Sequence, residues 1–381
     1  MIVIKSPKDC CGCTACASIC VHDAITMQPD VLGFLYPIVD YSKCVDCGLC
    51  EKVCQFNGNY DRSLNLQQPI AYAARHKDIN EVMKSRSGAI FVAISDYIIE
   101  QGGVIYGAGF KDHFRVAHKR AVTKADRDEF RGSKYVQSDL TGIFRQVKED
   151  LKNGLTVLFS GTPCQTSGLN AYAGKRLREN LFLIDIVCHG VAGPFIWRDY
   201  LTYLEKKHGS KIVDVNFRDK ELYGWKAHKE TFKFEGEGVR THFAFRFYQN
   251  ITFRHSCSVC HFTNLHRPSD ITLADYWGWQ RTSPDFNSDD KGCSLVFCNT
   301  EKGRLLFEAV KDRIYTIPAE LANVMQPQLT KPSYVHPKRL IMEEDYAKNG
   351  FEHSWRKCGV MGWRNDIRGL LRKCKMVLSK L

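Results

Sequence analysis

The chain has 381 residues, of which 44% are hydrophobic and 25% are charged, and its formal net charge at pH 7 is +12. This length suffices for a substantial core and for two or three structural units. We expect a cytoplasmic protein, because the first residues resemble no signal peptide and the longest apolar runs are too short to span a bilayer. Seventeen cysteines in a cytosolic chain argue against a disulfide framework and favour metal binding.

Two cysteine runs of identical spacing lie near the start of the chain. Each has the form C-x2-C-x2-C-x3-C, and the second repeats the first 34 positions later. This is the spacing of bacterial two-cluster ferredoxins, in which the last cysteine of each run binds the other cluster. The sequence therefore predicts a ferredoxin-like α+β domain at residues 1–58 with two 4Fe–4S clusters. Cluster I is assigned to Cys10, Cys13, Cys16 and Cys54, and cluster II to Cys44, Cys47, Cys50 and Cys20.

Zinc is the weaker alternative for these cysteines, because structural zinc sites usually combine two CxxC pairs that are further apart. Cys11 interrupts the spacing and is interpreted as a bystander. Val21 and Gln55 stand where such runs usually end in proline. Proline is not a ligand, so we expect ligation to survive. A polar, turn-rich segment follows at 55–69, and we place a domain boundary there.

The region from 70 to 334 alternates between predicted strands and helices. Strands are expected at 104–110, 114–122, 155–161 and 181–187. Helices are expected at 85–103, 139–154 and about 194–207. Because this alternation favours parallel pairing, we predict an α/β domain with a mostly parallel sheet. Cys293 and Cys298, five residues apart in a further strand, are predicted to lie on opposite faces.

Four cysteines of this region are expected to converge. Cys164 and Cys188 each follow a predicted strand, at the sheet edge where ligands of α/β domains bind. Cys257 and Cys260 form a CxxC pair, and together the four predict a third 4Fe–4S cluster. Alternatives remain open. Cys164 and Cys188 are also typical of core packing, Cys164 of a nucleophile at a helix N-terminus, and CxxC of zinc sites and redox pairs.

Seven short motifs occur in a characteristic order over about residues 1–280: SRSGAIF, GGVIYGAGF, GSKYVQS, GTPCQTSGL, DIVCHGV, CSVCHF and DITLADYWG. On these motifs the chain resembles the coenzyme F420 hydrogenase/dehydrogenase beta-subunit family, in the form with an N-terminal two-cluster ferredoxin domain. The resemblance implies an iron–sulfur flavoprotein with FAD next to a 4Fe–4S cluster. Some members use the deazaflavin F420, and plant relatives reduce a chlorophyll intermediate. Two motifs depart from the family pattern: SGA stands for SGG at 87–89, and ADYWG for GDFWG at 274–278.

Six residues are candidates for flavin binding. Ser87 and Gly88 are expected to open a helix whose N-terminal amides favour a pyrophosphate. Lys134 is expected to add a positive charge. Polar contacts to the isoalloxazine edge are expected from Gln137, Thr162 and Gln165. Ser87 as an ordinary N-cap and Lys134 as a solvated surface lysine are the alternatives. His189 is the candidate catalytic residue, as a proton relay to flavin or substrate, or else as a hydrogen-bonding neighbour of the cluster.

These parts predict an oxidoreductase that converts between two-electron and one-electron transfer. We expect ferredoxin or another redox protein to deliver electrons through the clusters to FAD and then to an organic substrate or F420. The alternative is a non-enzymatic subunit that passes electrons to the active site of a partner enzyme. The predicted flavin-binding residues at 85–190 distinguish the two functions, because a subunit that only carries electrons needs only the clusters. A redox-sensing module is a third reading, disfavoured by the number of clusters.

The segment 335–381 is predicted to be a basic tail outside the family core. Seven apolar residues at helical spacing give it an amphipathic helix: Ile367, Leu370, Leu371, Cys374, Val377, Leu378 and Leu381. Such a helix binds either an anionic membrane surface, which would suit a lipid-linked substrate, or the protein's own body. No recognition motif accompanies the charge, so no nucleic acid partner is expected.

Overall fold

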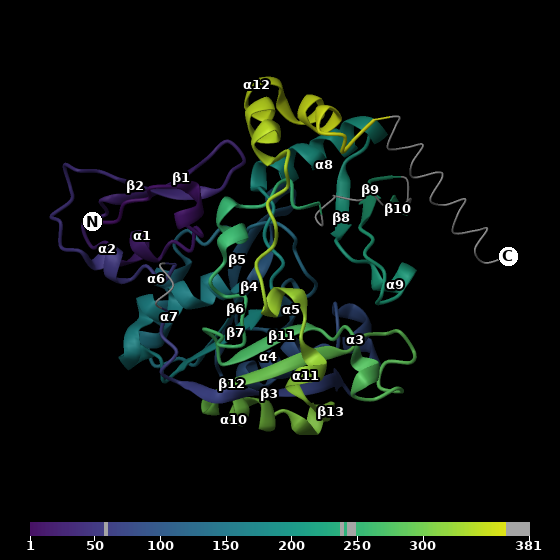
Figure 1. Ribbon diagram of the computed structural model, residues 1–381. Helices are drawn as coiled ribbons and strands as arrows, with labels where there is room; N and C mark the ends of the chain where they lie inside the picture. Colours follow the sequence, from purple (N-terminus) through teal and green to yellow (C-terminus); the bar gives the residue numbers. More distant parts are fainter. Residues whose placement is uncertain (57–59, 237–239, 242–248, 363–381) are drawn as a thin grey trace.

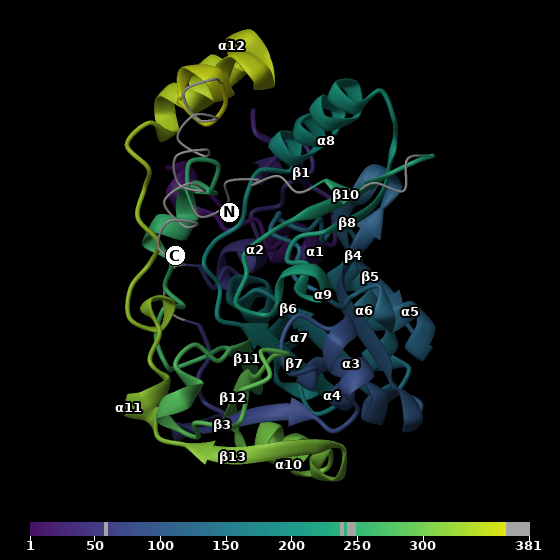
Figure 2. The same ribbon diagram turned by 90° about the vertical axis from the view of Figure 1, so that its right-hand side faces the viewer.

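The computed structural model describes residues 1–56, 60–236, 240–241 and 249–362 (Figure 1). An N-terminal unit lies beside a larger body, and the first helix of the unit contacts two helices of the body (Figures 1 and 2). Within the described ranges, every helix is too short or too polar to cross a membrane.

The N-terminal unit repeats one local pattern twice. A 3-10 turn, Pro7–Asp9, precedes the short helix α1 (Ala15–Ile19), and α2 (Leu49–Lys52) is its counterpart in the second run. The residue before each helix is left-handed, with φ 67° at Thr14 and 73° at Gly48. Glycine adopts this conformation freely, whereas threonine needs surrounding structure to hold it. Between the runs, β1 (Ile25–Pro29) and β2 (Leu35–Val39) form an antiparallel pair. The unit has the predicted α+β organisation.

The body is built on an eight-stranded sheet with the order β13-β3-β12-β11-β7-β6-β4-β5. Its strands are β3 (Asn65–His76), β4 (Val104–Lys111), β5 (Arg115–Ala121), β6 (Val157–Gly161), β7 (Leu181–Ile186), β11 (Ile271–Asp275), β12 (Ser294–Thr300) and β13 (Ile314–Ala319). Strands β4, β6, β7 and β11 pair in parallel in the centre. The strands on both sides of this group pair antiparallel. The predicted parallel sheet is thus present in the centre of a mixed sheet.

Helices cover both faces of this sheet (Figure 2). The helices of the body are α3 (Ile79–Lys84), α4 (Ile90–Glu100), α5 (Lys124–Asp128), α6 (Ile143–Lys152), α7 (Pro163–Leu177), α8 (Pro194–His208), α9 (Lys220–Tyr223), α10 (Glu301–Glu308), α11 (Leu321–Val324) and α12 (Arg339–Lys357). Alternate strand residues pack against α4 and α10 on one face and against α6 and α7 on the other. Cys298 lies in the core with α4 and α10, and Cys293 lies in the core of the opposite face, as predicted.

A second, smaller layer lies above the sheet. Strands β8 (Ile212–Asn216), β9 (Thr231–Phe234) and β10 (Arg240–Thr241) form an antiparallel sheet. Its buried face packs against α8 and α12, which lie near one another at the top of Figure 1. The first part of the predicted tail therefore packs on the body through α12. The predicted amphipathic helix at 367–381 lies outside the described residues.

Contacts at α6, α7 and α8 help to dock the N-terminal unit on the body. Arg145 of α6 donates hydrogen bonds to carbonyls at the end of α1. Gly168 of α7 lies so near Cys13 that an added Cβ would stand 2.7 Å from its sulfur. The amide of Phe195, in the first turn of α8, donates to the carbonyl of Leu32 at 3.0 Å. The unit is therefore held at its helix, at a cysteine and at its hairpin loop.

Candidate iron–sulfur and cofactor sites

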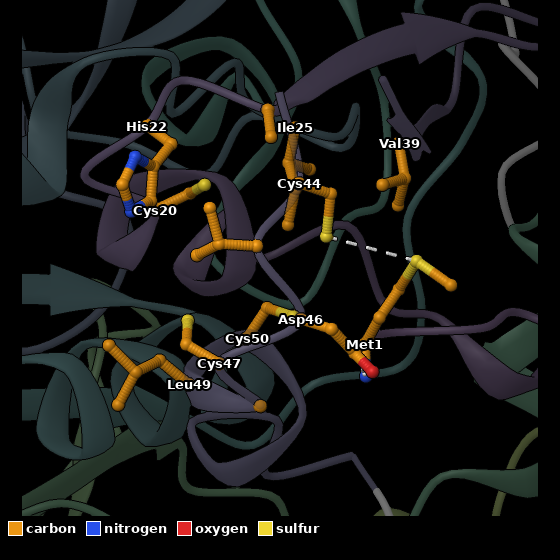
Figure 3. A pocket seen from close by; sticks show the side chains of 13 residues that line it. Met1, Cys20, His22, Ile25, Val39, Cys44, Asp46, Cys47, Leu49 and Cys50 are labelled. Atoms are coloured by element: carbon orange, nitrogen blue, oxygen red, sulfur yellow. Dashed lines mark hydrogen bonds and ion pairs between the residues drawn. The ribbon is translucent and has the colours of Figure 1, made fainter. Parts of the chain in front are cut away.

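The eight cysteines of the two N-terminal runs line two separate small cavities. Cys20, Cys44, Cys47 and Cys50 line one of them, here called the outer cysteine site, and Figure 3 shows these four side chains. Cys10, Cys13, Cys16 and Cys54 line the other, here called the inner cysteine site. Cys47 is exposed at the outer site, whereas no cysteine of the inner site is. The last cysteine of each run thus faces the cysteines of the other run.

The surroundings of both sites suit a multi-iron group. The amide of Ile2 donates to Cys50 Sγ at 3.2 Å, and that of Gly12 donates to Cys10 Sγ at 3.3 Å. Burial raises the pKa of Cys54 to about 11, so its thiolate needs a bound cation. Within the described residues, no three His, Cys, Asp or Glu side chains are grouped tightly enough to hold a single metal ion. A four-iron cluster spaces its ligands more widely than one ion does.

Four body cysteines line a third cavity, here called the body cysteine site. Cys164 lies in the first turn of α7 directly after β6, and Cys188 follows β7 by two residues. Cys257 and Cys260 lie on and just after the 3-10 turn His255–Val259. Burial raises the pKa of Cys257 to about 12 and that of Cys260 to about 11. Sulfurs from three separate segments therefore converge at the carboxyl ends of β6 and β7, and Cys164 faces other cysteines.

Cys11 lies between the inner and body cysteine sites. Its side chain is 5% exposed, and both Cys11 and Phe56 line the two cavities. The Cys11 thiol donates a hydrogen bond toward Cys164, and this contact lowers the pKa of Cys164 to about 7. The surplus cysteine of the first run is thus part of the wall between two cysteine sites.

A cavity of about 610 Å³ lies beside the body cysteine site. It opens at the sheet edge where β6, β7 and β11 end, at Gly161, Ile186 and Asp275. Its size is within the usual range of small-molecule and cofactor sites. Six residues line both this cavity and the body cysteine site: Thr162, Gln165, Cys188, His189, Gly190 and Val191. A group bound in the cavity would therefore be a direct neighbour of the cysteines.

Four of the six residues predicted to contact a flavin line this cavity, namely Ser87, Lys134, Thr162 and Gln165. The other two do not. Gly88 donates its amide to Ser294 Oγ, and an added Cβ would stand 2.3 Å from the Ala74 carbonyl, so the glycine is required by packing against the sheet. Gln137 lines the body cysteine site, where its side chain donates to the Cys11 carbonyl at 2.9 Å.

The predicted helix start at Ser87 is wrong. Helix α4 begins at Ile90, and the residue before it, Ala89, is left-handed with φ 62°. Ser87 donates its hydroxyl to the Cys293 carbonyl at 2.6 Å instead of capping the helix. Lys134 is not solvated either, since its ammonium donates to the carbonyls of Glu129 and Arg131, and burial lowers its pKa to about 7.

Thr162, Gln165 and His189 occupy the boundary between the two cavities. Thr162 and Gln165 form a capping box at the start of α7, and Thr162 Oγ1 lies 3.2 Å from Cys164 Sγ. The imidazole of His189 is held by Asn250 at 3.2 Å and by Gln328 at 2.6 Å. Burial lowers the pKa of His189, so its neutral form is favoured at pH 7. A fixed, neutral imidazole at this boundary suits proton transfer as well as hydrogen bonding.

Sequence reasoning missed the cationic and aromatic part of the cavity. Arg218 donates to Asp275 at 2.5 Å, and Arg86 lies 3.5 Å from the same carboxylate. The Trp277 ring, in the ADYWG motif, stacks on Trp225 with centroids 4.6 Å apart. The motif gave the signal, because its aspartate and tryptophan both reach the cavity. Arg86 lies in the SRSGAIF motif and Arg218 lies outside all seven motifs, and neither was named as a candidate.

Comparison with known proteins supports these observations. Residues 9–57 match the 4Fe-4S dicluster domain family. Residues 154–322 match the family described as the C terminus of the coenzyme F420 hydrogenase/dehydrogenase beta subunit. No curated protein sequence matches the chain.

Among solved structures, the chain is similar to one in the xenon-derivatised F420-reducing [NiFe] hydrogenase complex from Methanosarcina barkeri. The two share 19% identity with a TM-score of 0.48, over 77% of this chain and 92% of that chain. The two family matches place an iron–sulfur domain before a region that contains the four body cysteines and part of the lining of the large cavity. By these two matches the chain is similar to the coenzyme F420 hydrogenase/dehydrogenase beta-subunit family over residues 154–322 and carries a 4Fe–4S dicluster domain before that region, which points to a redox role in electron transfer.

Proposed function

We propose that the chain is an iron–sulfur flavoprotein that moves electrons between a redox protein and an organic substrate or the deazaflavin F420. One observation carries the proposal: the cavity of about 610 Å³ shares six lining residues with a site of four half-buried cysteines. An electron-transfer subunit without a substrate of its own needs the cysteines but not the cavity. The continuity of the two therefore favours an enzyme over a wiring subunit.

Three four-iron clusters are proposed. Cluster I is assigned to the inner cysteine site, cluster II to the outer cysteine site, and the third cluster to the body cysteine site. Each site offers four sulfurs, which is the ligand set of a 4Fe–4S cluster. When bound, the clusters supply one-electron transfer and the flavin supplies hydride transfer. The chain's own residues fix where these groups stand and how exposed they are.

The charges of the large cavity support FAD as its occupant. Five cationic side chains line it: Arg86, Arg131, Lys134, Arg218 and Arg281. Asp275 is the one carboxylate among its described lining residues, and it pairs with two of these arginines. Arg131 is paired with Glu81 and Asp128, which are not among the lining residues. The cations that line the cavity suit the pyrophosphate of a dinucleotide. His189, at the boundary with the body cysteine site, is proposed as the residue that holds or passes a proton at its imidazole.

The test is a cofactor count on protein purified without oxygen. About twelve irons and one FAD per chain are expected, because three clusters hold four irons each. Cys260→Ser should reduce the count to about eight while the flavin stays, since Cys260 lines only the body cysteine site. Cys293→Ser is the matched control, a buried cysteine outside all three sites, and should keep all irons. Eight irons without flavin in the unaltered protein would overturn the proposal in favour of a wiring subunit.

A further inference from the structure

A single arginine joins the inner and body cysteine sites. The Arg254 side chain is 2% exposed. Its Nε donates to the Cys10 carbonyl at 2.8 Å, one terminal nitrogen donates to Gln137 at 2.9 Å, and the other approaches Cys10 Sγ at 3.6 Å. Gly12 makes room for it, because an added Cβ would stand 2.8 Å from the guanidinium. The guanidinium is therefore enclosed and aimed at a sulfur of the inner cysteine site.

The main chain of the same residue supports the body cysteine site. Its carbonyl accepts the amide of Cys257 at 3.0 Å, and its amide donates to the carbonyl of Val191 at 3.1 Å. Cys257 and Val191 both line the body cysteine site. One residue thus fixes a cysteine of one site through its side chain and a cysteine of another through its backbone.

The hydrogen-bond acceptors of Arg254 are neutral carbonyls and the Gln137 amide, together with the Cys10 sulfur. The nearby carboxylate of Asp30 is engaged by the amides of Leu32 and Phe34. A buried cation without a paired anion is costly. The ionisable groups that face it are the Cys10 thiol first, then the Tyr36 phenol, whose ring centroid lies 4.2 Å from the guanidinium carbon, and then the Cys11 and Cys257 thiols. Thiolates that carry a cluster would supply this counter-charge.

The outer cysteine site has the opposite electrostatic surroundings. The carboxylates of Asp46 and Glu51 lie beside it and share one cation, the Met1 ammonium, at 3.1 and 3.5 Å. Both carboxylates are largely exposed, at 75% and 70%. The inner site therefore has a buried positive charge, and the outer site has an excess of negative charge in contact with water.

Resting on the proposed clusters, we propose that Arg254 holds the reduction potential of cluster I above that of cluster II, so that electrons arriving at the outer site are drawn toward the body. Adding one electron makes a cluster more negative, and no proton or bond change is needed. A buried guanidinium at 3.6 Å from a ligand sulfur stabilises that added charge, and cluster potentials respond to net charge and to hydrogen bonds at sulfur. Arg254 is thus a positioning residue that acts through Cys10.

The experiment is a redox titration of the anaerobic holoprotein, followed by electron paramagnetic resonance, with iron counted in the same samples. Arg254→Gln should retain about twelve irons and shift the midpoint potential of the inner cluster to a more negative value, with a smaller shift at the body cluster, whose site Arg254 also lines, and none at the outer cluster. Arg254→Lys should restore most of the shift. Arg145→Gln is the matched control, because Arg145 also binds main-chain carbonyls of the N-terminal unit, including that of Cys20 at the outer site, but is 48% exposed. It should leave the midpoint potential of the inner cluster unchanged.

Gln137→Glu covers the case in which Arg254→Gln does not fold. It keeps the guanidinium and places a carboxylate on the atom that Arg254 already contacts at 2.9 Å, so the same potential should again become more negative. An unshifted potential in either fully loaded variant would overturn the role of Arg254 while leaving the cluster count intact. Unaltered protein without three clusters would instead count against the proposed function.

Discussion

The inner and outer cysteine sites arise from the same sequence pattern and end in different surroundings. Each has four cysteines, a left-handed residue before its helix and a main-chain amide that donates to sulfur. The inner site is covered by α7 and faces Arg254, whereas the outer site has the exposed Cys47 and two solvent-facing carboxylates. The difference teaches that ligand spacing decides which group is held, while the neighbouring elements decide how that group behaves.

The largest expected effect comes from exchanging single cysteines for serine. Cys20→Ser and Cys44→Ser should each remove about four irons and leave the same spectrum, because both line the outer site. Cys54→Ser and Cys10→Ser should share a different spectrum, because both line the inner site. Iron analysis and paramagnetic resonance of the four variants measure this. If Cys20→Ser resembled Cys10→Ser, each run would bind its own cluster and the crossed arrangement would be wrong.

Acid should weaken the body region that supports the inner site. His118 is 1% exposed and bonded to Ser138, the residue next to Gln137, and burial lowers its pKa to about 4. The unfolded chain, with a histidine pKa of about 6.5, binds the proton more readily between these values. The free energy of unfolding should therefore fall by roughly 3 kcal/mol as pH drops from 6.5 to 4.

Denaturant titration at several pH values measures this slope. His118→Gln should flatten it. His22→Gln is the matched control, because His22 is exposed and lines the outer site, so the slope should remain. A pH-independent unfolding free energy in the unaltered protein would contradict the prediction.

A smaller effect is expected from filling the close contact at the inner site. Gly168→Ala places a Cβ at 2.7 Å from Cys13 Sγ and 2.9 Å from its Cβ. Overpacking of this kind costs about 1–3 kcal/mol, and here the strain falls on the inner site alone. Thermal unfolding should show the loss, and the resonance signal of the inner cluster should broaden while that of the outer cluster stays. Ser167→Ala, one residue away on the same helix, should leave both signals unchanged.

The sequence was enough to predict the position of a site residue where that position depends on local spacing or on the order of the strands. The cysteine runs define their sites by spacing, and Cys164 and Cys188 could be placed together because both follow strands that end at one sheet edge. Gly88 and Gln137 were misplaced because their partners, Ala74, Ser294 and Cys11, come from other parts of the chain. The start of α4 was missed because Ala89 takes a left-handed conformation that its side chain does not favour.

Arg254 was not predicted as a site residue, because its partners also lie far away in the sequence. It stands three residues before Cys257, in RHSCSVC, and nothing in that spacing says that its side chain crosses to the N-terminal unit. The pairing of the outer strands was also not predictable from local sequence. Alternating strands and helices indicate parallel neighbours, but β3, β12 and β13 come from both ends of the body and pair antiparallel. Long-range partners of this kind leave no local pattern.

The docking of the N-terminal unit has a consequence for the rate at which the chain works. Arg145, Gly168 and Phe195 fix the unit at three places, so the distance between the inner and body cysteine sites is a constant of the fold. A carrier domain on a hinge must diffuse between a loading and an unloading position, and its turnover slows in a viscous solvent. Electron flow across this fixed contact requires no such excursion, so added glycerol or sucrose should slow the encounter with the external redox partner but not the transfer inside the chain.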